Sequence, residues 1–374
     1  MATYKDSSPF YITITDFPSW YPAVGAIADI SSSTQRDFLS AYGVSDGSTN
    51  YPARTYQSNM LDPYSGGVLL RESGIPYFHA MGGGHDDGSW NGTCKFGPLY
   101  GAGSDTPAWS IGAPASIPSV IQIGVGVYSD GKPASQHTYD CIDGSGSCIY
   151  AGKISAFYGN PAGGQTTPYR WDSSTNTWTI WNVSPPFYDS TGHGGGAAVY
   201  YNGKIFYYEG AGYAHPLKAF DINSQTWSQE SGDSFVYGDT MLAFDSNRGA
   251  LLALGHNSTV RAVYWADISN FPNNTGRRTT VSTSVDTDSS SLVYNPDEDI
   301  FVVPIPGTQS IQYISAATLA AGQSGTWSTR TFTGATPSAQ KDTGTFGRFQ
   351  YIPELKGYIN IPKATSHVYF YRSA

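Results

Sequence analysis

The feature that most constrains the fold is a unit of about 50 residues that recurs along the chain. One copy reads GHGGGAAVYYNGKIFYYEG at 192–210, followed by LKAFDINSQTWSQES at 217–231. Its first two apolar runs are joined by Asn202 and Gly203, a pair typical of two-residue hairpin turns. Because each copy holds up to four strand-like runs, the period predicts the blades of a β-propeller, most similar in length to kelch repeats.

Tryptophans at the start of the fourth run mark this period. Trp178 and Trp227 are 49 positions apart, and Trp227 and Trp327 are 100 apart, which corresponds to two units with the middle tryptophan replaced. Trp109 and Trp178 are 69 apart, so the unit between them carries an insertion. Counting the copies gives six clear blades. A pair of β-sandwiches, the other all-β architecture considered, would not explain the period.

The last copy has only three strand-like runs, so the ring needs one more strand. A strand from the opposite terminus would cover the exposed edge of that blade, and FYITITDF at 10–17 is the predicted candidate. Residues 20–65 are poorly patterned and are interpreted either as a seventh, degenerate blade or as a long insertion. The sequence therefore predicts an N-terminal segment, 1–65, and an all-β propeller of six or seven blades, 66–374.

Composition fits this fold and argues against two classes of function. Charged residues make up 13% of the chain and aromatic residues 14%, whereas charged residues are about 25% of typical soluble domains. The net charge of −9, with only 20 Lys and Arg, argues against nucleic-acid binding. No apolar run reaches the roughly 20 residues that span a bilayer, so membrane insertion is not expected.

The N-terminus lacks the apolar segment of a secretory signal, yet the chain is poor in lysine and rich in Tyr, Asn, Thr and Gly, as extracellular proteins often are. Three settings reconcile these observations. A leader was replaced, export needs no signal, or the protein belongs to a virus particle that acts outside the cell. Under the virion hypothesis, residues 1–65 carry the surface that docks other assembly proteins.

The three cysteines do not form a disulfide scaffold or a zinc motif. Cys141 and Cys148 flank IDGSGS, which is typical of a hairpin turn. Because residues facing each other across a hairpin can meet disulfide geometry, a Cys141–Cys148 bond is one expectation and two free thiols are the other. Cys94 is expected to be packed in the core.

Topology predicts where the polar residues of the units meet. The connection into the first strand of a blade and the turn between its second and third strands lie on the same face of the ring. Five of the seven histidines fall on such connections, whereas His79 and His367 fall in strands. The residues predicted to gather on this face are His85, Asp86, Asp87, Trp90, His137, Tyr139, His193, Tyr213, His215, Tyr237, Asp239, His256 and Arg348.

Three motifs carry a family resemblance, namely MGGGH at 81–85, STGHGGGAAVYYNGKIFYYEG at 190–210, and the Thr-Trp pairs at 177–178, 226–227 and 326–327. They resemble kelch-like, galactose-oxidase-type propellers over residues 60–374, and such a resemblance indicates a fold more than a function. Galactose oxidase implies a copper site with a crosslinked Tyr–Cys pair. No cysteine lies among the face residues, so copper chemistry is not predicted.

A weaker resemblance is to propeller polysaccharide lyases such as the ulvan lyases, which are similar in placing His, Tyr and Arg around the channel mouth. β-Elimination from a uronic acid needs a base, an acid and a cation on the carboxylate. The candidates are His137 or His193 as base, Tyr237 or Tyr139 as acid, and Arg348 as the cation. Arg348 has an alternative role, an ion pair with an aspartate such as Asp342.

Glycan recognition needs less than catalysis, because rings stack on sugars and Asn, Asp and Tyr hydrogen-bond them. Trp90, in the DDGSWNG loop, is the predicted stacking platform, whereas the repeat position of Trp178 and Trp227 indicates core. The residues assigned to substrate contact are His85, Asp86, Asp87, Trp90, Tyr139, Tyr213, His215, Asp239 and His256.

The sequence favours a glycan-recognising propeller that acts outside the cell, with a virion tail or spike as the hypothesised setting. A polysaccharide lyase and a purely structural scaffold are the alternatives. No cofactor is expected, although His85, Asp87 and His137 are candidate ligands for a divalent metal.

Overall fold

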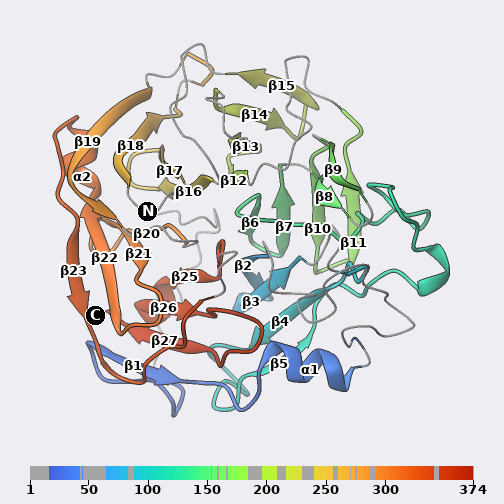
Figure 1. Ribbon diagram of the computed structural model, residues 1–374, viewed down its shortest axis with the longest axis horizontal. Coiled ribbons are helices and arrows are strands. Elements are labelled where there is room, and N and C mark those ends of the chain that lie inside the picture. Colours follow the sequence, from blue (N-terminus) through green and yellow to red (C-terminus); the bar gives the residue numbers. More distant parts are fainter. Residues whose placement is uncertain are drawn as a thin grey trace.

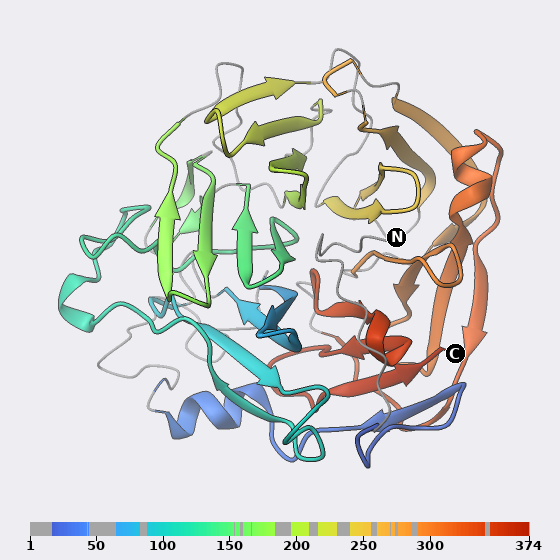
Figure 2. The same cartoon turned by 180° about the vertical axis from the view of Figure 1, so that it is seen from behind.

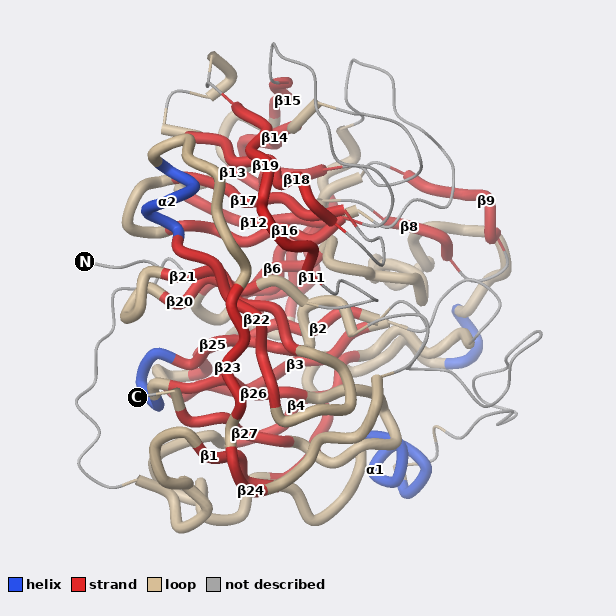
Figure 3. The backbone as a smooth tube through the Cα atoms, turned by 60° about the vertical axis from the view of Figure 1, so that its left-hand side comes forward, coloured by secondary structure: helices blue, strands red, loops and turns tan. Residues whose placement is uncertain are grey.

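The chain forms a ring of six antiparallel blades in a computed structural model (Figure 1). The predicted propeller is therefore confirmed, and its six blades match the six clear copies of the repeat. Strands dominate, and the two α-helices, α1 (Gln35–Ala41) and α2 (Ala316–Ala320), are short (Figure 3). The structure describes residues 17–42, 44, 65–82, 88–152, 154–157, 160–165, 167–183, 196–208, 216–229, 240–255, 260–269, 271–273, 276–285, 291–340 and 345–373.

The first three blades each pair four strands in sequential order. Blade one holds β2 (Gly66–Glu72), β3 (Ile75–Met81), β4 (Thr93–Gly97) and β5 (Ala108–Ile111). Blade two holds β6 (Ile142–Ser145), β7 (Cys148–Ala151), β10 (Tyr169–Asp172) and β11 (Thr177–Ile180). Blade three holds β12 (Ala197–Tyr201), β13 (Lys204–Tyr208), β14 (Lys218–Asp221) and β15 (Thr226–Gln229).

The last three blades follow the same order until the chain ends. Blade four holds β16 (Thr240–Asp245), β17 (Ala250–Gly255), β18 (Val260–Asp267) and β19 (Gly276–Val285). Blade five holds β20 (Val293–Asn295), β21 (Ile300–Pro304), β22 (Ser310–Ser315) and β23 (Ser328–Thr331). Blade six takes β25 (Phe349–Ile352), β26 (Gly357–Asn360) and β27 (Tyr369–Arg372) from the C-terminus.

An N-terminal strand completes blade six, as expected, but from a different segment. The added strand is β1 (Ala26–Asp29), which pairs antiparallel with β27 and is followed outward by β24 (Thr333–Gly334). Assigning this role to residues 10–17 was wrong, because an alternating pattern indicates a strand without specifying its partner. Residues 10–16 lie outside the described part. In the part of 20–65 that is described, β1 and α1 are the regular elements, so this part is not a seventh blade.

The first strand of every blade lies innermost, and these strands contact one another around the ring (Figures 1 and 2). The cycle runs β2, β6, β12, β16, β20, β25 and back to β2. Buried apolar side chains form six clusters, one between each pair of neighbouring blades. The repeat tryptophans, including Trp109 and Trp327, pack into these clusters at or next to the fourth strands, which explains their spacing.

The insertion between Trp109 and Trp178 is confirmed in two places. The crossover from β5 to β6 spans 112–141 and includes the short 3-10 helix η1 (Pro118–Val120). A second hairpin, β8 (Ile154–Phe157) and β9 (Asn160–Gln165), lies between β7 and β10. Both additions leave the four-stranded blade intact.

Two faces of the ring follow from the antiparallel topology. The hairpin face carries the turns between strands one and two and between strands three and four of each blade. The crossover face carries the turns between strands two and three and the connections into the next blade. The polar residues predicted to gather are those of the crossover face.

On the hairpin face, a buried ion pair joins the first and last blades. Arg71 Nε lies 2.7 Å from Glu354 Oε1, and Nη2 lies 3.0 Å from Oε2. The two side chains are 5% and 4% exposed. Such a two-point contact holds the guanidinium and the carboxylate in one geometry.

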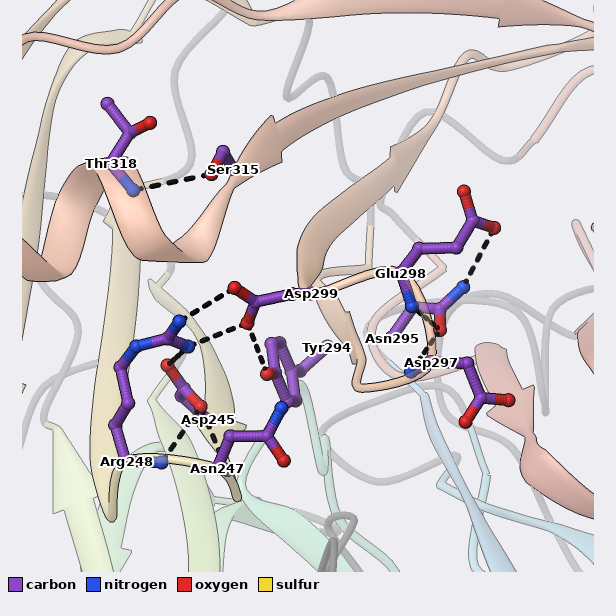
Figure 4. Close-up of polar contacts among 10 residues, drawn as sticks. All are labelled: Asp245, Asn247, Arg248, Tyr294, Asn295, Asp297, Glu298, Asp299, Ser315 and Thr318. Atoms are coloured by element: carbon purple, nitrogen blue, oxygen red, sulfur yellow. Dashed lines mark hydrogen bonds and ion pairs between the residues drawn. The ribbon is translucent and has the colours of Figure 1, made fainter.

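A second ion-pair network joins blades four and five (Figure 4). Arg248 donates to both carboxylate oxygens of Asp299 at 2.6 and 2.7 Å, and to Asp245 Oδ2 at 2.8 Å. Tyr294 donates its hydroxyl to Asp299 Oδ1. Burial would raise the pKa of Asp299, but the hydrogen bonds from Arg248 and Tyr294 outweigh it and hold that pKa below its usual value. Burial raises the pKa of Asp245, although Arg248 opposes the rise.

Candidate functional site

A polar segment is buried where the chain enters blade two from the crossover face. Residues 135–141 are each at most 4% exposed. The Thr138 hydroxyl accepts the Gly66 N–H at 2.7 Å and donates to the Met81 carbonyl at 2.6 Å. Asp140 Oδ2 accepts the Leu242 N–H at 2.9 Å, although Leu242 belongs to blade four. The segment therefore ties three blades together near the axis of the ring.

His137 and Tyr139 lie within this buried segment. The His137 and Tyr139 rings meet edge to face at 5.7 Å, and the Tyr139 ring meets Phe346 of the crossover into blade six at 5.4 Å. Tyr139 has a φ of +46°, a backbone conformation that bulky residues rarely adopt. Both side chains are at most 4% exposed, so no polymer reaches them in this conformation.

Arg348 lies at the same end of β2 and is 1% exposed. Its Nε donates to the Ser65 carbonyl at 3.1 Å, and Nη1 donates to Gln35 Oε1 at 3.4 Å. Two glycines let these groups approach. A Cβ at Gly66 would lie 2.2 Å from the Tyr139 carbonyl oxygen, and one at Gly67 would lie 3.2 Å from Arg348 Cγ. The structure thus brings His137, Tyr139 and Arg348 to one strand end.

Of the other residues predicted for this face, Trp90 is described and the remaining nine lie outside the described part of the chain. This also holds for Asp342, the predicted ion-pair partner of Arg348. The predicted face residues without a described position are His85, Asp86, Asp87, His193, Tyr213, His215, Tyr237, Asp239 and His256.

The prediction that Trp90 is an exposed platform is wrong. Trp90 is 1% exposed and belongs to the apolar cluster between blades six and one. Its neighbour Asn91 is also buried and donates to Ser116 Oγ at 2.9 Å and to the Pro133 carbonyl at 2.8 Å. The long crossover of 112–141 thus folds back on this loop, which sequence pattern alone does not reveal.

The prediction of a Cys141–Cys148 disulfide is also wrong, because neither sulfur is in a disulfide. The hairpin itself forms, but Cys148 pairs with Ser145, whereas Cys141 precedes the strand and its carbonyl accepts the Gly152 N–H. Ser145 lies four positions after Cys141, or about 13 Å along the strand at the usual rise. Cys94 is fully buried, as expected, and burial raises its pKa to about 12.

A pocket opens on the crossover face between blades five and six. It is a small hollow open to solvent, with interior space for about one water molecule. One wall is the turn after β21, residues 304–307, and the opposite wall holds Asn360 and Pro362 after β26. Ser338, Gln340 and Thr345, from the crossover into blade six, complete the lining. Among the described residues, those that line the hollow are uncharged.

Sequence reasoning missed this pocket, although a repeat marks it. The second strands of blades five and six end in Pro304-Ile305-Pro306 and Asn360-Ile361-Pro362, at equivalent positions. These neutral turns hold none of the His, Asp, Arg or aromatic residues that mark a site in sequence. Their fixed proline φ angles build two rigid walls.

Among the described residues, no three His, Cys, Asp or Glu side chains are placed to hold a metal ion. His137 is described, whereas His85 and Asp87 are not, so the structure does not test the predicted metal site. In the same part of the chain, no helix has both the length and the apolar character needed to cross a membrane.

No protein-family model matches the chain, and no curated protein matches its sequence. Among solved structures, the chain is similar to YjhT, with 12% identity, a TM-score of 0.48, and coverage of 83% of this chain and 94% of that one. It is similar to a member of the duf4221 family from Bacteroides vulgatus, with 9% identity, a TM-score of 0.46, and coverage of 86% of this chain and 94% of that one. It is also similar to an auxiliary nutrient binding protein from Bacteroides thetaiotaomicron, with 9% identity, a TM-score of 0.48, and coverage of 92% of this chain and 75% of that one. At these values the likeness carries no argument about function.

Proposed function

We propose that this propeller recognises a glycan through its crossover face. The observation that carries the proposal is the shallow hollow between blades five and six, which sets amide and hydroxyl side chains (Ser338, Gln340, Thr345 and Asn360) beside prolines on this face. A sugar residue presents the matching chemistry, because hydroxyl groups both donate and accept hydrogen bonds while C–H faces pack on apolar surface.

Recognition is favoured over β-elimination by the burial of the catalytic candidates that the structure describes, whereas His193 and Tyr237 lie outside the described part. A base, an acid and a cation must touch the reacting sugar. His137, Tyr139 and Arg348 are 3%, 4% and 1% exposed, and Thr138 and Asp140, within the same segment, hold strands of three blades. Their positions support a structural role at the channel mouth.

The proposal extends to a protein that works outside the cell, as a receptor-binding part of a virion or a similar assembly. The low charge and high tyrosine content support this setting. The described part of residues 1–65 is bound into the ring, since β1 completes blade six and the Tyr21 hydroxyl donates to the Leu355 carbonyl at 2.6 Å. An assembly partner would therefore contact this part of the N-terminal segment as a portion of the surface of the ring.

Two assays on the full chain test the proposal together. A glycan array, followed by calorimetry on the glycans retained, is expected to show saturable binding. Absorbance at about 235 nm with alginate, pectin, ulvan and glycosaminoglycans is expected to stay flat, because elimination would create an absorbing double bond. A rise that disappears in His137→Ala would replace recognition with lyase activity, and an array without any binding would contradict both.

A further inference from the structure

We propose that His79 is a pH-dependent switch: its protonation in mildly acidic solution releases the start of the long crossover, residues 112–115, from blade one. Three features carry this inference, which is independent of glycan recognition. The imidazole is buried between two blades, one of its nitrogens has no partner among the described residues, and the backbone of the crossover packs on that nitrogen.

His79 lies in β3 and is 0% exposed. Its ring lies 5.5 Å from that of Trp171 in blade two, and its Nε2 lies 3.1 Å from Glu72 Oε1. Burial would raise the pKa of Glu72, but the hydrogen bonds from His79 and Lys95 outweigh it and hold that pKa below its usual value. Because an ionised carboxylate only accepts hydrogen bonds, Nε2 carries the proton of the neutral imidazole and Nδ1 keeps its lone pair.

The surroundings of Nδ1 have no place for a second proton. This nitrogen is buried and has no hydrogen-bond partner among the described residues. A Cβ at Gly112 would lie 2.9 Å from it, so the Gly112 backbone packs closely on the ring. Protonation would turn Nδ1 into a buried donor without an acceptor, which is costly in free energy. The closed crossover therefore fits the neutral ring and not the imidazolium.

The charges near His79 do not offset this cost. Among the described residues, the charged side chains that act on His79 are Glu72 and Lys95. Lys95 forms an ion pair with Glu72, so the carboxylate already has a cation. Burial lowers the pKa of His79, and the hydrogen bond to Glu72 does not cancel this effect.

The other described titratable groups around His79 do not change charge in mild acid. Arg170 and Asp172 flank Trp171 on β10, and strand alternation turns both away from His79. The remaining groups are tyrosines, which ordinarily lose a proton only near pH 10. They are Tyr77, Tyr128 and Tyr169.

The start of the crossover is held against Thr93 by hydrogen bonds that would break together. The Gly112 N–H donates to the Thr93 carbonyl at 2.8 Å, and the Thr93 N–H donates to the Ala113 carbonyl at 3.0 Å. The Ala113 N–H donates to the Thr93 hydroxyl at 2.6 Å. Farther along, the Ser116 N–H donates to Asn91 Oδ1 at 2.8 Å, which limits the opening to residues 112–115.

The direction of the pH dependence follows from proton binding. In the open state His79 meets water and titrates near its ordinary value of about 6.5, whereas the closed state binds its proton less readily. Opening is therefore favoured as the pH falls below about 6.5, by up to about tenfold for each pH unit.

Hydrogen exchange of the full chain at pH 7.5 and pH 5.5, with labelling times scaled to the intrinsic exchange rate at each pH, tests the switch. The protection factors of the Thr93, Gly112 and Ala113 amides are expected to fall about five- to tenfold at pH 5.5. Those of β21 and β22 in blade five are expected to stay unchanged. His79→Gln replaces the imidazole with an amide that does not titrate, and it is expected to give equal protection at both pH values.

The matched control is His367→Gln, which makes the same change at a histidine that is 45% exposed and pairs with Asp29. It is expected to keep the wild-type response to acid. Lys95→Gln leaves Glu72 to the imidazolium alone and is expected to make the acid-induced loss of protection smaller. Equal wild-type protection at both pH values, or a loss that persists in His79→Gln, would overturn the inference. If His79→Gln does not fold, an unchanged loss in Lys95→Gln would overturn it instead.

Discussion

The two faces of the ring use polar residues in opposite ways. On the hairpin face, two ion pairs join neighbouring blades, Arg71 with Glu354 and Arg248 with Asp299. On the crossover face, an uncharged hollow lies between blades five and six, and charged groups near the axis, such as Asp140 and Arg348, are buried and hydrogen-bonded to backbone. Ion pairs between blades therefore stabilise the hairpin face, whereas hydrogen bonds from buried polar side chains to backbone stabilise the crossover face near the axis.

This difference between the two faces follows from the kind of connection that each face carries. Hairpin turns are short and repeat at one height, so a side chain on one blade meets the same position of the next blade. Crossovers vary in length, from the long connection of 112–141 to the short one between β19 and β20. The irregular connections can enclose a pocket, and regular turns cannot.

The largest expected effect comes from breaking the pair that closes the ring. Glu354→Gln leaves the buried Arg71 without its carboxylate partner, and we expect the free energy of unfolding to fall by about 3 kcal/mol. Urea denaturation measures this loss. Glycan affinity of the folded protein is expected to stay unchanged.

The matched control is Glu298→Gln, whose partner Arg330 lies in the same blade. The two side chains are 24% and 30% exposed, so water screens the pair, and a loss of less than about 1 kcal/mol is expected. Equal losses for the two substitutions would show that burial of the first pair has no energetic consequence.

Arg248→Met is expected to cost about 2–3 kcal/mol at pH 7, because it removes charged hydrogen bonds from Asp299 and from Asp245. The lowered pKa of Asp299 means that its pairing stabilises the fold above about pH 4 and that this contribution is lost as the pH falls. The difference between wild type and variant should therefore shrink between about pH 5 and pH 3. Denaturation curves of both proteins at pH 7 and pH 3.5 measure this change. A difference in stability that stays constant between the two pH values would contradict the stabilising role given to the Arg248–Asp299 pair.

The period and its tryptophans were sufficient to predict the fold, because each copy must bury the same face against a neighbour. The closing strand was misassigned because β1 lies in a poorly patterned stretch, whereas residues 10–17 alternate clearly. Trp90 and the cysteine pair were wrong because their surroundings depend on a long crossover and on strand register. The neutral pocket was missed because Asn360 and Gln340 carry no chemistry that singles them out in sequence.

Asp140→Leu probes the buried segment of the crossover face. The substitution removes the acceptor for the Leu242 N–H, and leaving that buried donor unpaired costs about 1–3 kcal/mol. Thermal unfolding measures the change. If the melting temperature is unchanged, this segment does not tie the blades as described.

The smallest expected effect is that of reducing agent. Because Cys141 and Cys148 form no disulfide, dithiothreitol should leave the melting temperature unchanged, as should Cys148→Ser within about 1 °C. A clear drop in the melting temperature with reductant would indicate that the Cys141–Cys148 disulfide does form.

The most direct test of the two-face account measures stability and glycan affinity in the same two variants. Asn360→Ala, on the crossover face, should lose affinity and keep its melting temperature within a few degrees. Asn247→Ala, an exposed asparagine on the hairpin face, should retain wild-type affinity and stability (Figure 4). The account predicts that only the crossover-face variant changes glycan affinity. Equal affinities in wild type and both variants would contradict it.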